Sequence, residues 1–478
     1  MRKTMFMLMA VVLGLAGLGA PVRAEEAPEM AEEEVFAEWN EDAPALQALI
    51  EYVETVTEEG SESFIPEEDR IAVFDMDGTL MGELYPTYLE YYMAAWRILK
   101  DPSFEPDAEM LEVGRTLRDC ALDKSFPEDM VMQHAVQAAR AYAGMTLNEF
   151  SDFCTEILLR DVDGFEGMTY GESFYLPMVE VIEYLQDNDF KCYVCSGTDR
   201  FICRTFIEGM VDIPYENVIG MDVQLEATGQ GETPGVDYAF TPGDDVVRTD
   251  HLLLKNLKTN KVLQIAQEIG RQPVLSFGNS SGDTSMHNYT ITNNVYPSAA
   301  FMLIADDDVR DYGDPAKGEE LRAKWEESGY HVISMANDWK TIYGEDVVKT
   351  GEFHWMEELA EDRVPADAAE TPEDKQYVMY LGTNEKDTNA PVCTQDEAME
   401  KAKEILIDHF GGYTIQEANG GWIGDDENVY QEYTLVIYLS DTTEDEVHAA
   451  ADELIDAFHQ SSILIQANPT TTEFYAGE

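Results

Sequence analysis

The chain has 478 residues, 44% of them hydrophobic and 10% aromatic, which is enough for roughly two to four domains with buried cores. Its 96 acidic residues outnumber 30 basic ones and give a formal charge of −66 at pH 7. A surface of this charge repels nucleic acids and anionic membranes, so we expect neither as a partner.

The first 24 residues have the pattern of a secretory signal peptide. They carry no acid, begin with the basic Arg2 and Lys3, continue with the apolar stretch Met5–Gly19 and end in P-V-R-A. A single membrane anchor is the alternative, but the apolar stretch is shorter than the roughly 20 residues that a span requires. We expect a mature chain that starts near Glu25, is secreted or otherwise extracytoplasmic, and has no stable membrane anchor.

Residues 25–69 form an acidic N-terminal segment with one helical pattern of apolar residues, between Ala43 and Val53. Next comes Ile71–Leu80, I-A-V-F-D-M-D-G-T-L. An apolar run that ends in turn residues predicts a buried strand, which places Asp75 and Asp77 at its carboxyl end. Ligands bind at that end of the strands in open α/β sheets.

A helical insertion follows at about residues 82–171. Apolar residues recur at helical spacing in four stretches and no strand is evident, which predicts a cap over the site. The stretches are Tyr88–Leu99, Glu109–Leu122, Glu128–Ala143 and Leu147–Leu158.

The α/β pattern then resumes and completes a domain over residues 70–345. Strand Phe190–Cys195 runs into S-G-T-D-R, which starts at Ser196, and strand Pro273–Phe277 runs into G-N-S-S-G-D, which ends at Asp283. Lys261 precedes a predicted helix, Val262–Ile269. Further strands are predicted at Tyr215–Gly220, Asp222–Ala227, Ala299–Ile304 and, at a sheet edge, Tyr330–Met335.

Residues 346–375 include the run P-A-D-A-A-E-T-P-E-D and few strong patterns, so we predict a linker. Residues 376–478 read as β-α-β-β-α-β, which predicts a ferredoxin-like α+β domain. Six cysteines remain in the chain. Cys120 with Cys154 is a candidate disulfide of an exported protein. Cys192 and Cys195 fall on opposite faces of a strand and should not bond to each other.

One chemistry accounts for the polar residues at these element ends. A carboxylate such as Asp75 can attack phosphorus and form an acyl-phosphate, while a second carboxyl group, Asp77, protonates the leaving oxygen and later deprotonates water. Mg²⁺ removes the repulsion between the nucleophile and the phosphate, and it prefers oxygen ligands. Lys261 and Ser196 suit the binding of the transferring oxygens.

These four stretches resemble the motifs of the haloacid dehalogenase-like hydrolase superfamily, and the helical insertion resembles the cap of its phosphoserine-phosphatase-like branch. The resemblance implies a Rossmann-like parallel sheet, with Asp75 as nucleophile and Asp77 as general acid/base. It implies phosphate binding by Ser196, Gly197 and Lys261, with Lys258 and Lys255 as the other candidate lysines. It implies Mg²⁺ as cofactor, with ligands among Asp75, Asp77, Asp283 and Asn279.

Asn279 stands where many members of that superfamily have aspartate, which leaves open whether Asn279 or Asp283 binds the metal directly. An acid at the position of Asp77 favours a phosphatase or phosphotransferase, because the dehalogenase branch lacks it. Substrate recognition is expected from the cap, and the candidates there are Glu83, Tyr85, Arg97, Arg115 and Arg118.

The expected function is that of an exported Mg²⁺-dependent phosphomonoesterase acting on a small phosphorylated metabolite. Phosphoserine, phosphocholine, and sugar or nucleotide phosphates are all candidates. A phosphotransferase with the same site and a non-catalytic protein that captures a phosphorylated ligand are the alternatives. The C-terminal region, with Y-L-G-T-N-E-K-D-T-N, resembles small exported domains of no assigned activity and is expected to bind or regulate.

Overall fold

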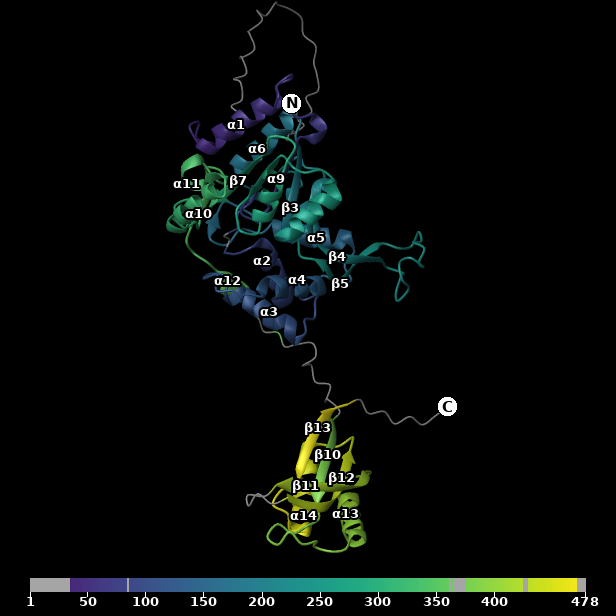
Figure 1. Ribbon diagram of the computed structural model, residues 1–478. Coiled ribbons are helices and arrows are strands. Elements are labelled where there is room, and N and C mark those ends of the chain that lie inside the picture. The colour runs from purple at the N-terminus through teal and green to yellow at the C-terminus, as the bar shows by residue number, and fades with distance from the viewer. Residues whose placement is uncertain (1–34, 84–85, 361–362, 364–374, 424–428, 471–478) are drawn as a thin grey trace, which may run out of the picture. The chain divides into compact units, whose positions relative to one another are not determined.

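The computed structural model describes residues 35–83, 86–360, 363, 375–423 and 429–470 (Figure 1). The chain divides into two compact units, one of Met1–Met93 with Cys120–Glu358 and one of Ala94–Asp119 with Leu359–Glu478. The predicted signal peptide, residues 1–24, lies outside the described residues. Among the helices that are described, none combines the length and apolar character needed to cross a bilayer.

The first unit contains a seven-stranded sheet in the order β5-β4-β3-β1-β6-β7-β8. Neighbouring strands from β4 to β8 are parallel, and β5 is antiparallel to β4. This mainly parallel sheet confirms the predicted Rossmann-like α/β core. In chain order the strands are β1 (Ile71–Phe74), β3 (Lys191–Asp199), β4 (Val218–Ala227), β5 (Val246–Leu254), β6 (Leu275–Gly278), β7 (Ala299–Ile304) and β8 (His331–Ser334).

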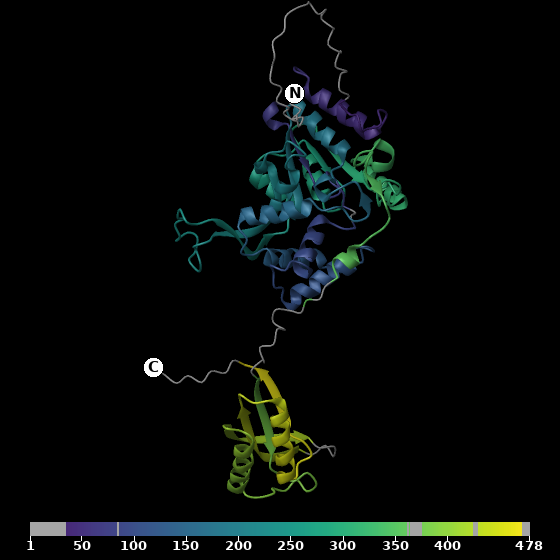
Figure 2. The same cartoon turned by 180° about the vertical axis from the view of Figure 1, so that it is seen from behind.

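Helices pack against this sheet through apolar side chains. Ile71 and Val73 of β1 share a buried cluster with Ile265 and Met286. At the edge of the sheet the long β4–β5 hairpin projects outward in both views (Figures 1 and 2). The helices of the core are α1 (Pro44–Thr57), α6 (Leu176–Asp187), α7 (Arg200–Ile207), α8 (Thr259–Gln264) continued by a π-helical turn at Ile265–Ile269, α9 (Thr284–Ile291), α10 (Pro315–Glu327) and α11 (Met335–Asp338).

The predicted cap is built largely of helices. They are α2 (Leu89–Leu99), α3 (Ala108–Asp119), α4 (Met130–Ala141) and α5 (Leu147–Leu158). Within the first unit, α4 contacts β5 and α5 contacts α7. Single 3-10 turns occur at Glu67–Asp69, Tyr170–Glu172 and Tyr215–Asn217.

Three predicted features differ from the structure. The two short strands expected at 215–227 are one strand, β4, whose register shifts where its partner changes from β3 to β5. The insertion, expected to lack strands, contains β2 (Phe165–Glu166), which pairs with β9 (Val348–Lys349). The predicted linker therefore begins with ordered structure, and it also holds α12 (Trp355–Glu358), since Trp355 is fully buried against Tyr92.

The candidate disulfide between Cys120 and Cys154 is not formed, and the six cysteines are all free. Cys154 is buried in α5, and burial raises the pKa of its thiol, which keeps that thiol protonated and unreactive. Cys192 and Cys195 both lie on β3 and are not bonded to each other.

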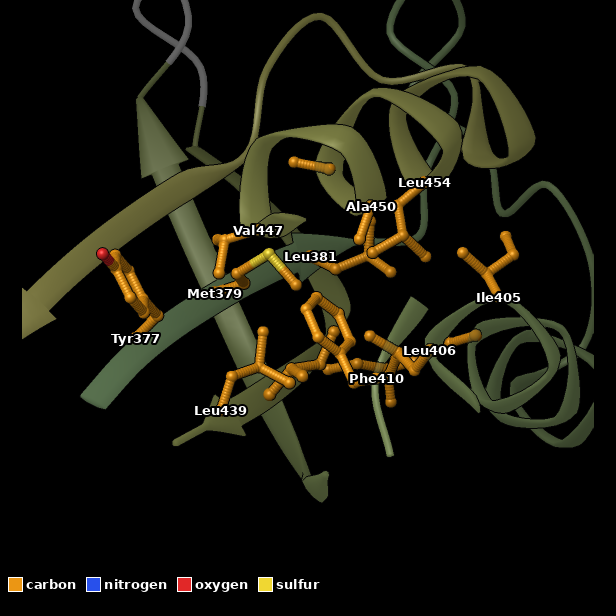
Figure 3. Close-up of a cluster of buried hydrophobic side chains, with 14 of the residues drawn as sticks. Tyr377, Met379, Leu381, Ile405, Leu406, Phe410, Leu439, Val447, Ala450 and Leu454 are labelled. Atoms are coloured by element: carbon orange, nitrogen blue, oxygen red, sulfur yellow. The ribbon is translucent and has the colours of Figure 1, made fainter. Parts of the chain in front are cut away.

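The C-terminal region forms a four-stranded antiparallel sheet in the order β11-β12-β10-β13. Alternate residues of β10, among them Met379 and Leu381, pack with Leu406, Phe410 and Leu454 in a core to which the two helices contribute (Figure 3). In chain order the elements are β10 (Lys375–Gly382), α13 (Gln395–His409), β11 (Thr414–Ile423), β12 (Val429–Leu439), α14 (Glu444–Phe458) and β13 (Leu464–Pro469).

Leu454→Ala is expected to destabilise this C-terminal region by about 2–5 kcal/mol, because it removes a fully buried side chain and leaves a cavity. Hydrogen-exchange mass spectrometry should show faster exchange in peptides from 375–470. Leu464→Ala is the matched control, since Leu464 is 60% exposed. Unchanged exchange in Leu454→Ala would contradict the packing described here.

Asp311 carries a pH-dependent cost to stability. Burial raises its pKa to about 6, against hydrogen bonds from Tyr343 and the backbone of Tyr312. The pKa of Asp311 is thus higher in the folded protein than in the unfolded chain. The free energy of unfolding that this residue contributes is fully present below the pKa of the unfolded chain and is lost as pH rises through about 6. Asp311→Asn should thus raise the free energy of unfolding by about 3 kcal/mol at pH 8 and by little below pH 4. Urea denaturation at both pH values tests this, with exposed Asp308→Asn as control; a gain independent of pH would contradict it.

Candidate active site

Three neighbouring strands place their carboxyl ends side by side. Because β1 lies between β3 and β6, the residues that follow these strands meet at one edge of the sheet. Asp75 follows β1 directly, and its backbone N–H donates to the carbonyl of Phe277 in β6. Thr198 lies near the end of β3, and Asn279 follows β6. The sheet order therefore gathers residues far apart in the sequence.

Lys261 connects two of the predicted acids. Its ammonium donates to Asp75 Oδ1 and to Asp283 Oδ1, both at 2.6 Å, and its side chain is 1% exposed. Burial lowers the pKa of Lys261, but the charges of Asp283 and Asp75 outweigh it and the net direction is upward. Burial and then the Asp283 charge raise the pKa of Asp75 to about 8. One lysine thus bridges two buried carboxyl groups and holds both in place.

Asp283 also organises the loop that carries it. Its Oδ2 accepts from the backbone N–H groups of Asn279 and Ser280 and from the Ser280 hydroxyl. Both oxygens of Asp283 are therefore engaged with protein groups. Burial raises its pKa, but the Lys261 charge and the hydrogen bonds prevail, and the net pKa lies below the usual value.

Asp77 is held by Thr198, whose hydroxyl donates to Asp77 Oδ2 at 2.7 Å. Burial and the charge of Glu90 raise the pKa of Asp77 to about 6, while the Thr198 hydrogen bond lowers it. A carboxyl group in this range can both give and take a proton near neutral pH. The next residue, Gly78, has φ +74°, which suits the tight turn after the acids.

Glu83 is bound to groups of the site itself. Its Oε2 accepts from the Asn279 side-chain amide at 2.5 Å, and its carboxylate is hydrogen-bonded to the Tyr88 side chain. Because the amide nitrogen of Asn279 points to Glu83, its amide oxygen is left for another partner.

A pocket of about 90 Å³ joins these groups. Its lining includes the site residues Asp75, Asp77, Lys261 and Asp283, and it extends to Tyr91 and Val131 of the cap helices. Glu90 and Lys255 also line it. They form a buried ion pair at 2.6 Å that joins α2 to the loop after β5.

Some of the predicted site residues line the pocket and others do not. Those that line the pocket are Asp75, Asp77, Glu83, Gly197, Lys261, Asn279 and Asp283. Ser196 is fully buried and is not part of that lining, and its Oγ accepts from the backbone N–H of Thr198. Of the alternative lysines, Lys255 is paired with Glu90, and Lys258 has positive φ at the start of α8.

The predicted arginines are not part of the pocket lining. Arg97 is buried in an ion pair with Asp101 and also donates to Ser103 at 2.9 Å. Arg115 and Arg118 lie on α3, where Arg118 pairs with Asp119. Tyr85 lies outside the described residues.

The sequence analysis did not single out Thr198, Glu90 or Tyr88, and it considered Lys255 only as a phosphate-binding lysine and not as the partner of Glu90. Thr198 belongs to the S-G-T motif, and because side chains alternate along a strand it lies on the same side of β3 as Ser196. That spacing could have identified it. The Glu90–Lys255 contact joins residues 165 positions apart, and no local pattern reveals it.

The donor atoms fit a magnesium ion that keeps several waters. Within the described residues no three carboxylate, imidazole or thiol groups are clustered as metal ligands. The Asp75 carboxylate, the Asn279 amide oxygen and the backbone carbonyl of Asp77 remain as oxygen donors. Mg²⁺ is often held by one or two carboxylates with water and substrate phosphate, and these three oxygen atoms are of that kind.

Comparisons with known proteins locate one matching family and several remote structures. The model of a protein of unknown function, DUF3574, matches residues 376–474. No curated protein matches the chain. Cytosolic 5′-nucleotidase IIIB bound to cytidine is similar over 60% of this chain and 84% of its own, at 12% identity and TM-score 0.37.

Two further solved structures are similar at equally low sequence identity. A phosphoserine phosphohydrolase-like protein from Francisella tularensis subsp. tularensis SCHU S4 is similar over 55% of this chain and 94% of its own, at 12% identity and TM-score 0.29. A phage SAM lyase in complex with S-methyl-5′-thioadenosine is similar over 20% and 81%, at 15% identity and TM-score 0.18. Likenesses this remote carry no conclusion about activity, which rests on the geometry above.

Proposed function

We propose that the chain is an exported, Mg²⁺-dependent phosphomonoesterase that acts through an aspartyl-phosphate on a small phosphoserine- or phosphocholine-like metabolite. The observation that carries the proposal is Lys261 between Asp75 and Asp283, in a pocket where Thr198 holds Asp77. This gives a nucleophile, a cation for the phosphate and a proton carrier in one place.

In the first step Asp75 attacks phosphorus, and the bond between phosphorus and the ester oxygen breaks. Asp77 gives its proton to the leaving oxygen. In the second step water attacks the aspartyl-phosphate and transfers a proton to Asp77, which releases phosphate and regenerates Asp75. The ammonium of Lys261 has three N–H donors, of which two are used by Asp75 and Asp283, so one remains for a phosphate oxygen.

Asp75, Asn279 and the carbonyl of Asp77 would hold Mg²⁺, and Asp283 would serve through Lys261 and the loop. When bound, the ion offsets the repulsion between the anionic nucleophile and the anionic phosphate. The hydrogen bond from the Asn279 amide N–H to Glu83 supports this role, because it would leave the amide oxygen of Asn279 for the ion.

The test is phosphate release from p-nitrophenyl phosphate, with Mg²⁺ and with EDTA. Release that requires the metal supports the proposal. No release in either condition would overturn the enzyme assignment and favour a protein that only binds phosphorylated ligands. Product analysis with an added alcohol separates the outcomes further, since a phosphorylated alcohol would identify a phosphotransferase.

For the C-terminal region we infer the ferredoxin-like class and a binding or regulatory role. The support is the order of its elements and the antiparallel sheet β11-β12-β10-β13 with α13 and α14 in one shared core. Export is supported by the pattern of residues 1–24, and the N-terminus of the mature protein, read by mass spectrometry, should lie near Glu25.

A further inference from the structure

The threonine that holds Asp77 lies in an irregular part of β3. Thr198 donates its hydroxyl hydrogen to Asp77 Oδ2 at 2.7 Å. The pairing of β3 with β4 shifts register between Cys195 and Asp199, so Thr198 lies where the ladder of backbone hydrogen bonds is interrupted. Irregularities of this kind occur beside active sites, where they re-aim a side chain. The direction of the Thr198 hydroxyl therefore depends on the contacts that fix the chain on either side of it.

Asp199 fixes the chain on the carboxyl side of Thr198. Its Oδ1 accepts from the backbone N–H of Phe201 and so begins α7. Arg248 of β5 donates to both carboxylate oxygens, to Oδ2 at 2.6 Å and to Oδ1 at 3.3 Å, and both side chains are buried. Two parallel hydrogen bonds between a guanidinium and a carboxylate fix orientation as well as distance. Arg248 thus determines where the residue after Thr198 lies.

Arg248 is in turn bound to the cap. Its backbone N–H donates to the carbonyl of Met145, and its carbonyl accepts from the N–H of Gly144, both in the turn between α4 and α5. Its guanidinium lies 3.9 Å from the centre of the Phe150 ring in α5, and an aromatic face attracts such a cation. A continuous set of contacts therefore connects this turn of the cap, through Arg248, to the segment that carries Thr198.

We propose that Arg248 is a positioning residue for the acid step, in which it acts through Asp199 to keep the Thr198 hydroxyl on Asp77. This inference rests on the proposed function, where Asp77 protonates the leaving oxygen. Arg248 is not among the residues that line the pocket, so it acts on the acid and not on the substrate. Its removal should therefore harm those substrates most whose leaving group needs a proton.

The experiment compares two esters that differ in this need. Ethyl phosphate loses a strongly basic alkoxide unless an acid protonates it, whereas p-nitrophenolate leaves without a proton. Arg248→Lys keeps the charge but loses the pair of parallel hydrogen bonds. We expect it to lower kcat/KM at least about tenfold more for ethyl phosphate than for p-nitrophenyl phosphate, and we expect the same of Thr198→Val. Equal losses for the two esters would overturn the inference, because a general loss of structure affects both alike.

Combining the two changes shows whether Arg248 acts through Thr198. In Thr198→Val protein, adding Arg248→Lys should alter the ratio of the two kcat/KM values by less than about threefold. A further change of about tenfold there would assign Arg248 another route and overturn the inference. Arg200→Lys is the matched control, because Arg200 also begins α7 and is paired with Asp222 and Glu268. It should leave the ratio of the two esters unchanged.

Two further arms cover a variant that does not fold and a protein that is not a phosphatase. Arg248→Met with Asp199→Asn leaves no unpaired buried charge, and the new amide oxygen can still accept from Phe201; it should show the same selective loss for ethyl phosphate. If the unaltered protein hydrolyses neither ester, the proposed function fails and urea denaturation replaces turnover. The midpoint loss of Arg248→Lys combined with Thr198→Val should then be smaller than the two separate losses together, and an additive result would overturn the inference.

Discussion

Asp75→Asn is expected to lower kcat for phosphate release by about 10⁴-fold. The amide oxygen can still accept from Lys261, so the site geometry should persist, but the amide is not a nucleophile toward phosphorus. The measurement is turnover of p-nitrophenyl phosphate with Mg²⁺. Acid-quenched mass spectrometry of the unaltered enzyme should also find a phosphoryl group on the peptide that contains Asp75.

Asp250→Asn is the matched control, since Asp250 is an exposed aspartate on β5. Its turnover should equal that of the unaltered enzyme. If Asp75→Asn keeps more than a tenth of the activity, or if the phosphoryl group is found on another peptide, Asp75 is not the nucleophile.

Asn279→Asp is expected to gain no affinity for Mg²⁺ while Glu83 is present, although it adds a negative charge to the site. The new carboxylate would replace an amide that donates to Glu83 Oε2 at 2.5 Å, so two carboxylates would meet there. Glu83→Gln removes that conflict. We expect the combination of Asn279→Asp with Glu83→Gln to bind Mg²⁺ about tenfold more tightly than Asn279→Asp alone, a difference of about 1.4 kcal/mol in binding free energy.

Calorimetric titration of both variants with MgCl₂ measures this difference without any assay of activity. Asn148→Asp, at an exposed position on α5, controls for added charge and should leave Kd unchanged. The prediction is wrong if Asn279→Asp alone binds Mg²⁺ more tightly than the unaltered protein and Glu83→Gln does not change that affinity.

Apolar periodicity was sufficient to predict most elements of the fold. Strand Ala299–Ile304 and helix Leu147–Leu158 have the predicted bounds, because each is an unbroken pattern with clear ends. The exceptions depend on distant partners. Strand β2 has two residues and exists through its pairing with Val348 and Lys349, and the segment near Trp355 is ordered because that side chain is buried against Tyr92.

In the site, too, local patterns predicted some residues and could not predict those that depend on distant contacts. Asp75, Lys261 and Asp283 could be predicted because each follows or begins its own element, and the parallel order of β3, β1 and β6 brings their ends together. Of the predicted cap residues Glu83 lines the pocket and Arg97 does not, since a helical pattern does not tell which polar residue points inward. Arg97 is bound to Asp101, whereas Glu90, on the same helix, lines the pocket.

The burial of Lys261 between two carboxylates also has a consequence for chemical labelling. An amine reacts with acylating reagents only as the free base, and this ammonium is 1% exposed with its pKa raised. Reagents that modify the exposed lysines of the chain should therefore leave Lys261 unmodified in the folded protein. The same residue should become reactive when the protein unfolds, so its labelling reports on the integrity of the site.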